Sequence, residues 1–60
     1  MTDAEIKVVE TMEKYGGSFI QALAKCFWHA DPINLEKLKS AFLEYWIQYE
    51  KMAEEKELKK

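Results

Sequence analysis

The chain contains no arginine, and its nine lysines stand against eleven aspartates and glutamates, which gives a net charge of −2 over 60 residues. Helices that read DNA sequence rely on arginine for paired hydrogen bonds to guanine, and nucleic-acid binding in general needs positive charge. We therefore do not expect direct nucleic-acid binding. No apolar run approaches the roughly 20 residues of a membrane-spanning helix, and no basic face lies opposite an apolar one, so a membrane role is not expected either.

Cysteine is represented once, by Cys26, so an internal disulfide is excluded. The first residues have neither the basic segment nor the apolar core of a secretory signal, and a reducing cytoplasm is therefore the expected compartment. Domains below about 70–80 residues usually depend on disulfides, metal or self-association. Since 48% of the residues are hydrophobic, the chain is too apolar to be a disordered tail, and we expect one small folded domain.

Glycine and proline are scarce, and their positions divide the chain into segments with helical patterns. Thr2 followed by Glu5 has the form of a capping box and predicts a helix over about residues 3–15. Gly16-Gly17 ends this helix, and Ser18 with Gln21 repeats the capping-box pattern for a second helix over about residues 18–30.

The last predicted helix starts at Asp31-Pro32, with Asp31 as the cap and Pro32 in the first turn. No glycine or proline follows, so this helix is expected over about residues 32–57, with the last few residues frayed. Its apolar residues alternate spacings of three and four, which is typical of a bundle core and, over so few heptads, only weakly of a coiled coil. The sequence predicts an all-α fold, a three-helix bundle with a long C-terminal helix.

This long helix raises the question of how its apolar side chains are covered. At 1.5 Å per residue it would measure ~40 Å, whereas a compact chain of this size is only ~27 Å across. The helix must overhang, bend or pair with another chain. The second helix is also apolar around most of its circumference, which is typical of a central helix.

We therefore predict a two-fold homodimer. The aromatic residues expected near its buried surfaces are Trp28, Phe42, Tyr45, Trp46 and Tyr49. All of these except Phe42 are also the expected anchors for a further protein partner. The alternative is a tight three-helix monomer in which the third helix is bent.

Cys26, His29 and Asp31 are the side chains that would be considered for catalysis. Cys26 and His29 lie three residues apart on one helix, so a contact between them is sterically possible. A lone cysteine on an apolar helix is more often a small core residue, and a histidine in a last turn can satisfy free carbonyls. A zinc site would need further ligands from a second chain. We predict no enzyme activity, no cofactor and no metal, with a thiol or metal role for this pair as a minor alternative.

Several short strings resemble a group of uncharacterised short proteins from phages and prophages. The strings are Lys14-Tyr15-Gly16-Gly17-Ser18-Phe19, Ala22-Leu23-Ala24, Ala30-Asp31-Pro32 with Asn34, Lys37 and Leu38, and Ala41-Phe42 with Glu44-Tyr45-Trp46 and Tyr49. The resemblance covers about residues 9–53 and carries no assigned activity. Those relatives tend to have proline where this chain has Leu43, which implies a bend between Ala41 and Leu43.

The resemblance implies a phage or mobile-element setting for this protein. Small phage proteins without catalytic groups commonly act by occupying the surface of a host protein. The leading hypothesis is a non-enzymatic, self-associating protein-binding module that inhibits or redirects a host protein, such as a defence nuclease, in the host cytoplasm. One alternative is a structural or assembly protein whose self-association is its function. The other is a weak DNA-associated regulator.

Overall fold

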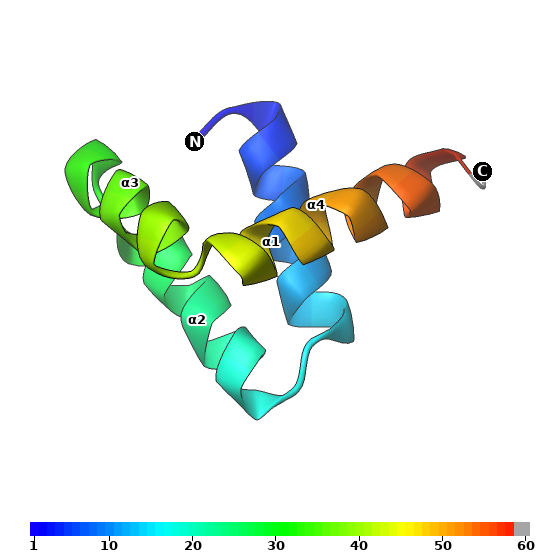
Figure 1. Ribbon diagram of the computed structural model, residues 1–60, viewed down its shortest axis with the longest axis horizontal. Coiled ribbons are helices and arrows are strands. Elements are labelled where there is room, and N and C mark those ends of the chain that lie inside the picture. Colours follow the sequence, from blue (N-terminus) through cyan, green and yellow to red (C-terminus); the bar gives the residue numbers. More distant parts are fainter. Residues whose placement is uncertain (59–60) are drawn as a thin grey trace.

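The computed structural model describes residues 1–58, which form four helices joined by tight connections. They are α1 (Asp3–Tyr15), α2 (Ser18–His29), α3 (Pro32–Ala41) and α4 (Leu43–Leu58). Helix α1 packs against both α2 and α4, and α4 lies crosswise over α1 (Figure 1). No strand occurs within residues 1–58, so the prediction of an all-α fold is confirmed.

The prediction of three helices is wrong, because the segment expected as one long helix is two. Phe42, with φ −120° and ψ 41°, leaves the helical conformation and separates α3 from α4. Its N–H donates to the Leu38 carbonyl at 3.0 Å and its carbonyl accepts from the Trp46 N–H at 3.0 Å, so the break is confined to one residue. It lies in the interval where the phage resemblance implied a bend.

The break has a reason in the dimensions of the molecule. An unbroken helix over residues 32–57 would be ~39 Å long, about twice the ~20 Å of α1 with its 13 residues and the ~18 Å of α2 with its 12, so much of it would extend beyond both helices. Turning the chain at Phe42 lays α4 back across α1, where Trp46 and Tyr49 become buried. Burial of two large aromatic side chains outweighs the loss of continuous helical hydrogen bonding at one residue.

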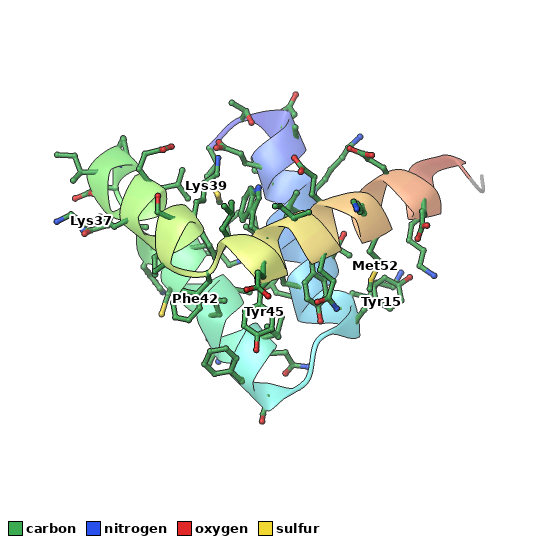
Figure 2. The ribbon with its side chains drawn as sticks, viewed as in Figure 1. Tyr15, Lys37, Lys39, Phe42, Tyr45 and Met52 are labelled. Atoms are coloured by element: carbon green, nitrogen blue, oxygen red, sulfur yellow. The ribbon has the colours of Figure 1, made fainter. Side chains whose placement is uncertain are left out.

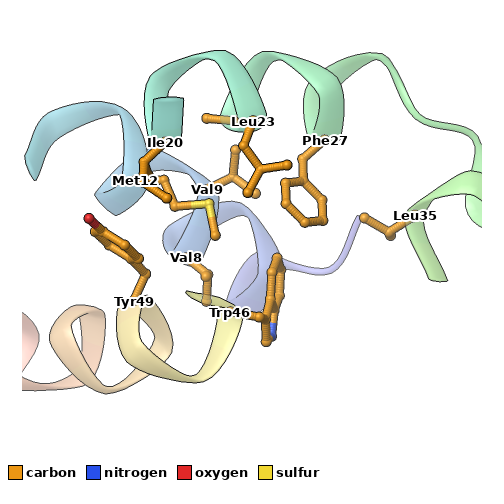
Figure 3. Packing of buried hydrophobic residues seen from close by; sticks show 10 residues of the cluster. Val8, Val9, Met12, Ile20, Leu23, Phe27, Leu35, Trp46 and Tyr49 are labelled. Carbon is orange, nitrogen blue, oxygen red and sulfur yellow. The ribbon is translucent and has the colours of Figure 1, made fainter. Parts of the chain in front are cut away.

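The core lies where α1, α2 and α4 meet (Figure 3). The ring of Phe27 from α2 is fully buried, and its centre lies 5.1 Å from that of Trp46 from α4. Leu35 extends the core toward α3. The remaining buried residues are Val8, Val9, Met12, Ile20, Leu23, Ala24, Tyr49 and Ala53.

Two of the three predicted helix caps are confirmed. The Thr2 N–H donates to the Glu5 carboxylate at 2.8 Å, and the Glu5 N–H donates to the Thr2 hydroxyl at 3.2 Å, which completes the capping box. Asp31 accepts from the N–H of Asn34 at 2.8 Å. The cap predicted at Ser18 is wrong, because Gly17 is the N-cap of α2 and no side chain caps this helix.

Glu5 also ties the first turn of α1 to α3. The ammonium of Lys39 lies 3.0 Å from the Glu5 carboxylate and 4.9 Å from the centre of the Trp46 ring. The hydrogen bond from the Thr2 backbone and the bond from Lys39 lower the pKa of Glu5 below its ordinary value. One lysine therefore connects the capping box, α3 and the edge of the core.

Gly16 lies at a close approach between α1 and α2. Its N–H donates to the Met12 carbonyl at 2.9 Å, and its own carbonyl accepts from the Gln21 side chain at 3.0 Å. A Cβ at Gly16 would stand 2.6 Å from the Met12 carbonyl oxygen and would overlap the side chain of Ile20. At Gly17, by contrast, an added Cβ would meet nothing within 4 Å.

Substituting these two glycines is expected to have opposite effects. Gly16→Ala forces backbone and the buried Ile20 side chain apart, and we expect a loss of about 1–3 kcal/mol in the free energy of unfolding. Gly17→Ala fits without contact and reduces the freedom of the unfolded chain, so stability should stay unchanged or rise by up to about 1 kcal/mol. Urea unfolding followed by circular dichroism measures both, and equal midpoints for the two variants would contradict the close approach.

Within residues 1–58, no helix is both long enough and apolar enough to cross a membrane. The fraying predicted for the last few residues falls partly on residues 59 and 60, which lie outside the described part of the chain.

Candidate protein interface

The five aromatic residues predicted for the interface are divided between the core and the surface. Trp46 and Tyr49 are 5% and 6% exposed and face α1 and α2. Trp28 and Tyr45 are 39% and 40% exposed, and Phe42 is half-buried. A partner can reach Trp46 and Tyr49 only if the helices separate, so the accessible part of the predicted set is Trp28, Phe42 and Tyr45.

Phe42 and Tyr45 belong to an aromatic group that also includes Phe19, and we call these three residues the aromatic surface. The ring centre of Phe19 lies 6.0 Å from that of Phe42 and 5.8 Å from that of Tyr45. Phe42 and Tyr45 are 6.4 Å apart and lie side by side where α3 passes into α4 (Figure 2). Phe19 is 55% exposed in spite of both contacts, so the group presents an aromatic edge to its surroundings.

An open hollow adjoins the aromatic surface at the break between α3 and α4. It has a volume of about 530 Å³, and we call it the bend hollow. Leu43, at its edge, is 52% exposed. The lining residues are Ser40, Ala41, Phe42, Leu43, Glu44, Tyr45 and Gln48.

Phe19 was not among the residues predicted for the interface. In the sequence it is one of many apolar residues of the second helix, and nothing in the local pattern separates it from those that became buried. Its partners become neighbours only through the break at Phe42. Phe19, Ala22 and Cys26 recur at spacings of three and four and are all exposed on α2. Ile20, Leu23 and Phe27 recur at the same spacings and are buried, so the spacing alone carries no signal for Phe19.

The side chains considered for catalysis lie elsewhere. Cys26 and His29 are exposed and line a shallow, mainly apolar groove between α2 and α3. The Asp31 carboxylate is engaged as the cap of α3. Among the side chains that the structure describes, those of residues 1–56, no group of three or more histidine, cysteine or acidic side chains is arranged to hold a metal ion.

A second hollow lies between α1 and α4, around Tyr15. The ammonium groups of Lys14 and Lys56 lie 5.5 Å and 4.8 Å from the centre of its ring. Tyr15 lies near Met52 of α4 (Figure 2), and Glu10 also lines the hollow. Lys14 and Lys56 already make cation–π contacts with the Tyr15 ring. This hollow is therefore a weaker candidate for a binding surface than the aromatic surface is.

Comparisons of this chain with protein-family models, with curated proteins and with solved structures give no match.

Proposed function

We propose that this chain is a small, non-enzymatic protein-binding module, and that the aromatic surface makes its main protein contact. The observation that carries the proposal is the exposure of Phe19, packed against Phe42 and Tyr45, on a protein whose core is complete without it. As the phage resemblance implies, the partner is a larger host protein that the module inhibits or redirects.

The chemistry of the aromatic surface suits protein recognition. Tyrosine and other aromatic side chains dominate the binding energy of many interfaces because they bury a large area with few rotatable bonds. The contacts among Phe19, Phe42 and Tyr45 hold the rings in place before a partner arrives, which reduces the entropy lost on binding.

Affinity capture from host lysate with matched variants tests this proposal. We expect Phe19→Ser to reduce recovery of the bound protein at least about 10-fold, as for loss of an interface anchor. Ile33→Ser is the control, because Ile33 is 69% exposed in the first turn of α3 and is not among the residues that line the bend hollow. Binding should then be measured with the purified partner. Equal affinity of wild type and Phe19→Ser would rule out the aromatic surface as the contact.

A further inference from the structure

The aromatic surface presents a projecting group and a receptive hollow side by side. The Phe19 ring projects from the first turn of α2, and its two ring partners, Phe42 and Tyr45, also line the bend hollow. The hollow, at about 530 Å³, is larger than one phenylalanine side chain, and Leu43 adds an apolar edge. One face therefore carries both halves of a contact that can be made with an identical face.

The charges on this face are also complementary between the hollow and the projecting group. Glu44 lines the bend hollow, and it is the one ionised side chain among the lining residues. The end of α2 that carries Phe19 has Gly17 as its N-cap, without a capping side chain and without an acidic residue in its first turn. The first N–H groups of a helix carry partial positive charge and favour a carboxylate. The hollow therefore carries a negative charge, whereas the helix end that bears the Phe19 ring carries partial positive charge.

From these two features we infer that the occupant of the aromatic surface, in the absence of another partner, is a second copy of this chain. The two copies are related by a two-fold axis. The Phe19 ring of each enters the bend hollow of the other, and each Glu44 carboxylate lies against the free N–H groups of the α2 N-terminus in the other copy. In a two-fold dimer each of these contacts forms twice, and no further copy can be added through the same surface.

This inference rests on the proposed function, because it names one occupant of the surface proposed to bind proteins. The apolar area available is modest, since the large exposed residues at the contact are Phe19, Leu43 and Tyr45. Interfaces below about 1,200 Å² of total buried area are characteristic of weak or transient complexes. The dimer is therefore expected to dissociate at micromolar concentrations, which leaves the surface accessible to a larger partner that competes with the second copy.

Sedimentation velocity over a concentration series from about 1 to 500 μM tests the dimer, with folding of every variant checked by circular dichroism. We expect wild type and the Ile33→Ser control to dimerise equally. Phe19→Ser should raise the dissociation constant at least about 100-fold, because both symmetry-related rings are lost together. Glu44→Lys should raise it about 10-fold by placing like charge at the α2 N-terminus.

A photo-reactive phenylalanine analogue at position 19 tests the geometry. We expect irradiation of the dimer to join position 19 of one copy to residues 40–48 of the other, as identified by mass spectrometry of a mixture of isotopically light and heavy chains. Cross-links that lead only to other segments would overturn the assignment of the bend hollow as the receptor.

The outcomes separate the inference from the proposed function. A wild-type chain that stays monomeric at 500 μM, or a dimer unaffected by Phe19→Ser, overturns the inference. If Phe19→Ser nevertheless abolishes capture of a larger partner, the proposed function stands without the dimer. If Phe19→Ser changes neither dimerisation nor capture, both proposals fail.

Discussion

Replacing Phe27 with alanine is expected to leave most of the protein unfolded at room temperature. The Phe27 side chain has no exposed surface, and its ring packs 5.1 Å from the centre of the Trp46 ring. Truncating a buried phenylalanine removes about 3–5 kcal/mol through lost burial and the cavity left behind. The core of a domain of this size rarely supplies more than about 3–5 kcal/mol of net stability, so the substitution removes most or all of it. Far-UV circular dichroism and urea titration should show a large loss of helix without denaturant.

Phe19→Ala is the matched control, because it removes the same side chain from the same helix at a position that is 55% exposed. We expect its free energy of unfolding to stay within about 1 kcal/mol of wild type. If Phe27→Ala unfolds at the same urea concentration as wild type, the contact between Phe27 of α2 and Trp46 of α4 does not stabilise the core. A large loss in Phe19→Ala instead would place Phe19 in the core and remove it from the proposed interface.

The helix ends that could be predicted from the sequence are those fixed by local hydrogen bonding. Thr2 and Asp31 accept from N–H groups a few residues away, and this geometry is independent of the rest of the fold. Ser18 looked similar, but Gly17 already supplies an extended residue before α2, and Gln21 reaches the Gly16 carbonyl instead. A capping pattern beside two glycines therefore permits two positions for the helix start, and the sequence alone does not choose between them.

The break at Phe42 could not be predicted from local pattern in the same way. Neither glycine nor proline lies nearby, and the apolar spacing of three and four continues from Leu38 through Phe42 to Tyr45 and Tyr49. The break is set by tertiary packing, because only a turned chain places Trp46 and Tyr49 against α1. Helical propensity, which favours continuity by tenths of a kcal/mol per residue, is weak beside that burial.

The same limit applies to the candidate interface. Periodicity shows that Tyr45 and Tyr49 lie near one another on a helix, but not which of them the neighbouring helices cover. The position of α1 decides this, and it leaves Tyr45 exposed and Tyr49 buried. That some large apolar side chains would stay uncovered could be predicted from the sequence. That Phe19, Leu43 and Tyr45 are among them and lie together depends on the break.

Proline substitutions at two exposed positions of α4 are expected to differ in their effect on stability, because one position lies inside the helix and the other is its first residue. Ile47→Pro removes a hydrogen bond inside α4 and places the ring against the carbonyl of Leu43, which costs about 3 kcal/mol or more. Leu43 is the first residue of α4, where an N–H has no partner within the helix and proline suits the backbone. We expect Leu43→Pro to lose less than about 1 kcal/mol, because Phe42 has already left the helical conformation.

Both leucine and isoleucine are about half exposed at these positions, so the difference between the variants reports on the backbone and not on lost packing. The free energy of unfolding from urea titration, with helix content from far-UV circular dichroism, measures it. If residues 32–57 formed one continuous helix in solution, Leu43→Pro would lie in its interior and would be as damaging as Ile47→Pro. Equal losses in the two variants would therefore contradict the break on which the bend hollow and the aromatic surface depend.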